Sequence, residues 1–163
     1  MMRNFQKLGI VFLMSVLLGC ATEQSVVNSK AEAKSNIVFI DIGKFDAELH
    51  ASLVAKDEPI VVSFYDQVSP NGMPDRLQKW LTSVERTGGK ITIEPPPNEL
   101  APKDPMLLFS LFSGLWSSMK AASQIQDEQV VKAAKGRTAV ISLERNAAKQ
   151  LVVGKVTFVK ASN

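Results

Sequence analysis

Residues 36–94 alternate between β-branched apolar runs and segments of helical periodicity, and this alternation constrains the fold more than any other feature. The runs at 36–42, 60–66 and 90–94 predict three strands. Short loops and intervening helices favour parallel strands joined by right-handed crossovers. Apolar residues at helical spacing predict the two intervening helices: Phe45, Leu49, Leu53 and Val54 in the first, and Leu77, Trp80, Leu81 and Val84 in the second.

Proline and glycine set the limits of these elements. Pro74 fits the first position of the second helix, and Gly88 with Gly89 ends it, because glycine accepts the left-handed cap conformation. Residues 95–105 (PPPNELAPKDP) then contain five prolines. Neither a helix nor a central strand accommodates so many missing N–H donors. We expect an extended, partly polyproline-like connector there.

The C-terminal part of the chain predicts helices followed by a β-hairpin. An apolar helix is expected over 105–120, and Ser123 resembles the start of a capping box for a further helix that Gly136 ends. Strands at 137–144 and 151–160 form the predicted hairpin. The sequence therefore predicts one α/β domain over 36–163. We expect a mixed sheet of about five strands, the first three parallel and the last two an antiparallel hairpin, with three or four helices.

The N-terminal segment has the pattern of an export signal. Arg3 and Lys7 precede an apolar run at 8–18, which is too short to span a bilayer. The run ends in Leu17-Leu18-Gly19-Cys20, which resembles the lipobox of bacterial lipoproteins. The resemblance implies cleavage after residue 19 and acylation of Cys20, so that lipid chains anchor the protein to a membrane. The alternatives are an ordinary signal peptide and a buried apolar start to the fold.

The residue after the cysteine bears on location. In lipoproteins of this kind, Asp at that position favours retention in the inner membrane, and this chain has Ala21 instead. The resemblance therefore implies a bacterial cell-envelope protein at the outer membrane, facing the periplasm. The polar segment that follows Cys20, up to residue 35, predicts a flexible tether between the lipid and the domain.

Charge and cysteine content narrow the function classes. Removal of residues 1–19 takes away two of the 19 basic residues and none of the 16 acidic ones, which lowers the formal net charge from +3 to +1. The remaining charges are interspersed, so no concentrated basic face for nucleic acid is expected. Once the single cysteine is acylated, no thiol remains for a disulfide, and the domain must rely on its core.

The 105–120 helix is the first candidate site. Its apolar side chains could dock a protein partner or lie on a membrane surface, and the other side of the helix carries small residues. The alternative, which we favour, is that the helix is buried against the sheet, because a domain of this size needs such a helix for its core. The candidate docking residues are Leu108, Phe112, Leu115 and Trp116.

Three carboxylates form the second candidate site. Asp41, Asp66 and Glu94 fall at or near the ends of predicted strands, where open α/β sheets bind ligands. Converging acids there could bind a small molecule or a cation, or act as acid and base. The alternative is that strands commonly end in acidic loops.

Motifs for other chemistries are not found in the sequence. The sole histidine, His50, has no neighbouring nucleophile, and no serine occupies a Gly-x-Ser-x-Gly elbow. We find no zinc-ligand spacing and no phosphate-binding glycine loop, so we expect no cofactor and no metal. We therefore favour a non-enzymatic accessory protein that binds another envelope protein. The alternatives are a ligand-binding domain or enzyme that uses the three carboxylates, and a structural protein that associates with the membrane through 105–120.

Overall fold

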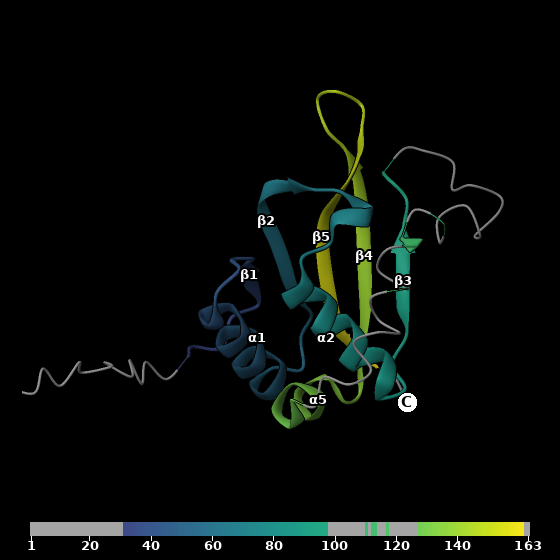
Figure 1. Cartoon of the computed structure of the whole chain (residues 1–163). Coiled ribbons are helices and arrows are strands. Elements are labelled where there is room, and N and C mark those ends of the chain that lie inside the picture. Colours follow the sequence, from purple (N-terminus) through teal and green to yellow (C-terminus); the bar gives the residue numbers. More distant parts are fainter. Residues whose placement is uncertain (1–30, 98–109, 111, 114–116, 118–126, 162–163) are drawn as a thin grey trace, which may run out of the picture.

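The computed structural model describes residues 31–97, 110, 112, 113, 117 and 127–161 of the chain, and within them it confirms a mixed α/β fold (Figure 1). Among the elements that the described residues define, three helices accompany one five-stranded mixed sheet, in agreement with the predicted fold class. The elements in chain order are β1 (Asn36–Val38), α1 (Gly43–Ala55), β2 (Ile60–Val68), the short 3₁₀ turn η1 (Pro70–Gly72), α2 (Asp75–Arg86), β3 (Ile91–Glu94), α5 (Glu128–Ala134), β4 (Arg137–Arg145) and β5 (Leu151–Lys160).

The strands are ordered β1-β2-β5-β4-β3 across the sheet. β1 pairs with β2 and β3 pairs with β4, both in parallel, whereas β5 is antiparallel to its neighbours β2 and β4. The first three strands therefore run in the same direction, as predicted, but β3 does not lie beside β2. The β4–β5 hairpin separates them, because the long apolar strand β5 takes the central position and the four-residue β3 lies at an edge.

The described helices share one face of the sheet (Figure 1). Alternate strand residues such as Val62, Ile141 and Phe158 point towards these helices and are fully buried. Leu49 of α1 and Trp80 of α2 belong to the same core as these strand residues and are also fully buried. The opposite face carries β-branched and hydroxyl side chains in register across four strands: Val61, Thr157, Val140 and Thr92.

One prediction for α1 is wrong. Val54 was expected on the buried face, but its side chain is 65% exposed. The residue that shares the buried face is Ser52, which is fully buried and whose hydroxyl donates to the carbonyl of Glu48 at 2.7 Å. The hydroxyl also accepts the backbone N–H of Lys34 at 2.8 Å, so the buried polar group is satisfied.

Charged groups stabilise the ends of two helices. α5 begins after Asp127, whose carboxylate accepts the backbone N–H of Val130, whereas the predicted cap Ser123 lies outside the described residues. At the C-terminal end of α1, the buried guanidinium of Arg137 donates to the carbonyls of Leu53 and Lys56. These carbonyls have no partner within the helix, and a cation there also complements the helix dipole. Burial lowers the pKa of Arg137.

Candidate functional site

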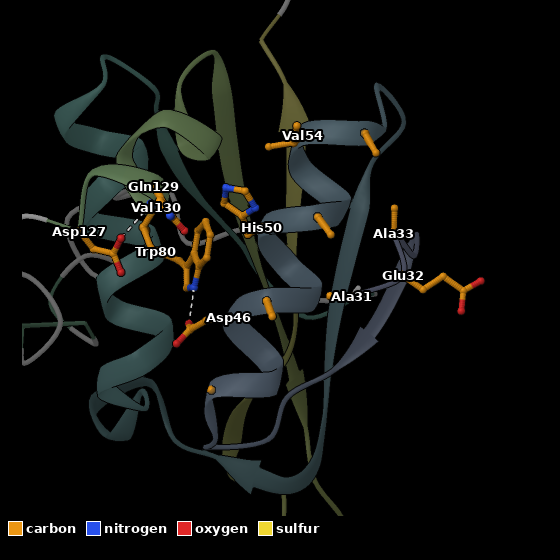
Figure 2. Close-up of a pocket in the computed structure, with 14 residues that line it drawn as sticks. Ala31, Glu32, Ala33, Asp46, His50, Val54, Trp80, Asp127, Gln129 and Val130 are labelled. Carbon is orange, nitrogen blue, oxygen red and sulfur yellow. Dashed lines mark hydrogen bonds between the residues drawn. The ribbon is translucent and has the colours of Figure 1, made fainter. Parts of the chain in front are cut away.

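A groove of about 920 Å³ lies over the outer surface of α1 (Figure 2). One wall is formed by the start of α5 with Trp80 of α2, and the other by residues 31–33, which precede β1. The volume is in the range of sites that hold drug-sized ligands or a segment of another protein. The groove is lined by Ala31, Glu32, Ala33, Gly43, Asp46, Ala47, His50, Ala51, Val54, Ala55, Trp80, Asp127, Gln129 and Val130.

Small residues at a four-residue spacing make the floor of the groove. Gly43, Ala47, Ala51 and Ala55 follow one another along the side of α1 that faces away from the core. No side chain of this row extends beyond Cβ, so an occupant can approach the backbone of α1 closely. Val54 adds an apolar side chain beside the row, and its exposure is explained by its place in the groove.

Asp46 fixes α1 to α2 beneath the groove. One carboxylate oxygen accepts the indole N–H of the fully buried Trp80 at 2.8 Å, and the other bonds to the guanidinium of Arg76. Arg76 also donates to Asp41 at 3.0 Å. The hydrogen bond to Asp41 is the main reason that the pKa of Arg76 is raised. Both oxygens of Asp46 are therefore engaged, which leaves it a structural acid rather than a free base or ligand.

The α5 wall is held by a second ion pair. Asp127 caps α5 and pairs with Lys79 of α2 at 2.7 Å. The hydrogen bond from Lys79 holds the pKa of Asp127 below its usual value. This pair positions Gln129 and the largely buried Val130 beside Trp80 (Figure 2).

The opposite wall is tied down just after residues 31–33. The backbone N–H of Lys34 donates to the buried Ser52 hydroxyl, and its ammonium group pairs with Glu48 at 3.0 Å. The carbonyl of Ser35 then accepts the N–H of Val61 at 2.8 Å, next to the start of β1. Residues 31–33 thus lie along the groove, directly before the fastened Lys34 and Ser35.

The chemistry of the lining favours binding over catalysis. His50 lies in the groove, and within the described part of the chain its imidazole has no hydrogen-bond or ionic partner. Among the described residues that line the groove, none carries a hydroxyl or thiol that the imidazole could activate. The groove offers a largely apolar surface with a few polar groups, which suits binding of an apolar ligand or of a segment of another protein.

The structure does not bring the three predicted carboxylates together. Asp41 follows β1 at one edge of the sheet and is paired with Arg76, whereas Glu94 ends β3 at the opposite edge and accepts a hydrogen bond from Ser142. Four strand spacings separate these edges, about 19 Å. Asp66 is exposed on β2. Across the described ranges, no group of three His, Cys, Asp or Glu side chains could hold a metal ion.

Glu94 lies instead in a smaller hollow of about 390 Å³ at the β3 edge. The hollow also contains Glu144, Lys155 and two prolines that follow β3, Pro95 and Pro97. The start of the proline-rich connector thus borders the sheet, but the hollow does not include the other two predicted acids.

The structure contradicts the predicted docking face of the 105–120 helix at one of its four residues, Phe112. Phe112 is fully buried in the core and cannot contact a partner, which supports the alternative that this segment packs against the domain. Leu108, Leu115 and Trp116 lie outside the described residues. Considering only the residues the structure describes, no helix is long and apolar enough to cross a membrane.

Sequence reasoning missed the groove. The signal was present as glycine and alanine every four residues on the side of α1 opposite Phe45 and Leu49. The walls come from residues 31–33, from Trp80 and from the start of α5, which are separated from α1 in the sequence, and no local pattern reveals that they meet there. No protein-family model, curated protein or solved structure significantly matches the chain.

Proposed function

We propose that this protein is a lipid-anchored, non-enzymatic accessory protein of the bacterial envelope, and that its domain binds a partner protein in the groove over α1. The observation that carries the proposal is the groove itself, with its small, apolar floor and its two fixed walls. Because Phe112 is buried, we place the proposed docking surface on α1 rather than on the 105–120 segment.

The location rests on the N-terminal sequence. A basic start, a short apolar run and Leu-Leu-Gly-Cys at 17–20 support acylation of Cys20, and Ala21 supports the outer membrane. The tether then enters the domain at the groove wall, since residues 31–33 form that wall. A docking site so close to the anchor suits a protein that holds a partner near the membrane.

The contacts of the two aspartates in the groove support a binding role. Asp46 and Asp127 are engaged with Trp80, Arg76 and Lys79. These contacts fix the walls of the groove and leave no carboxylate pair for acid–base work. The functional residues of the groove are therefore those whose shape matters, above all Ala47, Ala51 and Ala55.

Photo-crosslinking in intact envelopes tests the proposal. A photoreactive residue at position 51 of the lipidated protein is expected to give a discrete protein adduct, and the same residue at Ala148, in the exposed β4–β5 turn, is not. In a pull-down, Ala51→Arg should reduce recovery of that partner about tenfold or more, because Arg keeps the helix but fills the groove. Ala148→Arg is the matched control, and circular dichroism confirms that both variants fold.

Two outcomes would contradict this function. If neither position gives a protein adduct while the protein stays in the membrane fraction, the groove does not serve a protein partner. If Ala51→Arg and Ala148→Arg recover equal amounts of a partner, the partner binds elsewhere on the domain.

A further inference from the structure

We infer that the open face of the sheet, the face opposite the described helices, binds a second copy of this chain (Figure 1). In the two-fold dimer, Lys155 of each copy faces Glu94 and Glu144 of the other. The open face is separate from the groove over α1, so this inference does not depend on what the groove binds.

In the described strands, the central part of the open face carries no charged side chain. Its residues alternate with the buried ones along each strand and are half-buried or exposed. A sheet face that meets only water is usually polar, whereas this one includes four valines. Two copies can therefore cover it without desolvating a charge. The uncharged residues are Asn36, Val38, Val61, Ser63, Thr92, Thr138, Val140, Ser142, Thr157 and Val159.

Charged side chains gather at one end of the open face. Lys155 of β5, Ser142 of β4 and Glu94 of β3 lie in one row across the sheet. Glu144 lies on the same face of β4, two residues beyond Ser142. Glu94 accepts a hydrogen bond from the Ser142 hydroxyl at 3.0 Å, and within the described part of the chain Lys155 pairs with neither acid. One cation and two acids are therefore available to a second copy.

A two-fold axis parallel to the strands, midway between β4 and β5, brings these charges together. It places β5 of each copy over β4 of the other, and β2 over β3. Lys155 then lies over Ser142 of the second copy. Glu94 of that copy is one strand away, and its Glu144 is two residues away. Packed sheets are about 10 Å apart, a gap that a lysine and a glutamate side chain span together.

The charges also exclude the other symmetric arrangement. A two-fold axis perpendicular to the strands would place Lys155 over the uncharged end of the second copy, near Val159 and Thr138. A charge buried without a partner is costly, so the axis parallel to the strands is favoured. Because an isologous contact occurs twice, the dimer gains two clusters of Lys155 with Glu94 and Glu144.

The overlapping area is sufficient for a specific contact. Four strands at about 4.8 Å make the overlap about 19 Å wide, and β4 and β5, with 9 and 10 residues, are about 30 Å long. Each copy therefore contributes on the order of 500 Å² in projection, or about 1,000 Å² in total, which is the lower end for a specific interface. Val140 would lie opposite Thr157, and Val61 opposite Thr92.

This symmetry also suits two copies on one membrane. Rotation about an axis parallel to the strands leaves the direction of every strand unchanged, so β1 begins at the same end of the dimer in both copies. With the proposed lipid on Cys20, both tethers would reach the same bilayer. An axis perpendicular to the strands would place the two starts of β1 at opposite ends.

Co-purification of two differently tagged full-length copies, expressed together and extracted in mild detergent, tests the inference. Wild-type copies should co-purify. Lys155→Glu in both copies should lower recovery of the second tag about tenfold or more, because like charges then face each other. Glu94→Lys/Glu144→Lys in both copies should have the same effect. One copy of each variant should restore recovery, since every contact again joins opposite charges.

Controls and contrary outcomes are defined for the same assay. Lys135→Glu, exposed at the end of α5 on the helix side of the sheet, should leave recovery unchanged. Circular dichroism checks that each variant folds. The inference is overturned if wild-type copies do not co-purify, if neither charge variant lowers recovery, or if the mixed pair is recovered as poorly as each variant alone.

Crosslinking provides a second measurement that needs no change of charge on the open face. A photoreactive residue at Val140 of the lipidated full-length protein, in intact envelopes, should give an adduct of twice the chain mass. Mass spectrometry should place the captured residue on β5 near Thr157. The same photoreactive residue at Lys135 should give no such adduct. An adduct of position 140 with another protein, or no adduct at all, would overturn the inference.

Discussion

At the scale of single residues, Asp46 is expected to matter more for stability than Asp41, although both pair with Arg76. Asp46 accepts the indole N–H of the fully buried Trp80, whereas Asp41 is exposed. Asp46→Ala leaves that buried donor unsatisfied and should lower the free energy of unfolding by about 1–3 kcal/mol. Asp41→Ala removes only a surface ion pair and should cost less than about 1 kcal/mol. Urea denaturation of the soluble domain measures both.

An isosteric variant separates the roles of Asp46. Asp46→Asn keeps an oxygen that can accept from Trp80 and loses the charge that pairs with Arg76. It should therefore be more stable than Asp46→Ala. If the Asn and Ala variants are equally unstable, the ion pair rather than the indole contact holds α1 to α2.

At the scale of elements, the two glycines that end α2 have different reasons to be glycine. Gly88 has φ of +85° with open space around it, whereas at Gly89 a Cβ atom would lie 2.0 Å from the carbonyl oxygen of Arg137. Gly88→Ala should cost about 1 kcal/mol, the usual penalty for a left-handed alanine. Gly89→Ala must push β4 away from the end of α2 and should cost clearly more. The reverse order in urea denaturation would contradict this packing.

Asp127, which caps α5, should make the free energy of unfolding depend on pH in the acidic range. Because Lys79 holds the pKa of Asp127 below its usual value, Asp127 adds stability above its unfolded pKa of about 3.9, and this is lost as the pH falls through the folded pKa. Asp127→Asn keeps a capping side chain but does not titrate. The difference in free energy of unfolding between wild type and Asp127→Asn should therefore be larger at pH 7 than at pH 3.

Removal of the lysine supplies the control for this pH dependence. In a Lys79→Met background the pKa of Asp127 should return towards its usual value, and the pH dependence of the Asp127→Asn difference should shrink. A difference that is the same at pH 7 and pH 3 with Lys79 present would mean that the pair does not couple to folding.

Sequence periodicity predicted the elements better than their arrangement. The positions of the strands and of α1 and α2 follow from local apolar patterns, such as Leu77 and Trp80 on one face of α2. The insertion of the β4–β5 hairpin between β2 and β3 does not, because pairing between distant strands leaves no local signal. The separation of Asp41 from Glu94 follows directly from that strand order. The groove was missed for the same reason, since its walls are distant in sequence.

At the scale of the whole molecule, one segment links the proposed anchor to the proposed docking site. Lys34 and Ser35 fasten the chain to α1 and β2 through Ser52, Glu48 and Val61. Residues 31–33 just before them form a wall of the groove. A partner bound in the groove would therefore contact residues 31–33 as well as α1, and the proposed docking and anchoring would be coupled through a few residues.

The anchor itself is tested by Cys20→Ala. If acyl chains on Cys20 hold the protein, the variant should move from the membrane fraction to the soluble fraction when cells are fractionated, because no other thiol can be acylated. Metabolic labelling with a clickable fatty acid should mark the wild type and not the variant. The folded domain should be unchanged by circular dichroism, since Cys20 lies before the first described residue. Retention of the unlabelled variant in the membrane would mean that the apolar run at 8–18, not a lipid, anchors the chain.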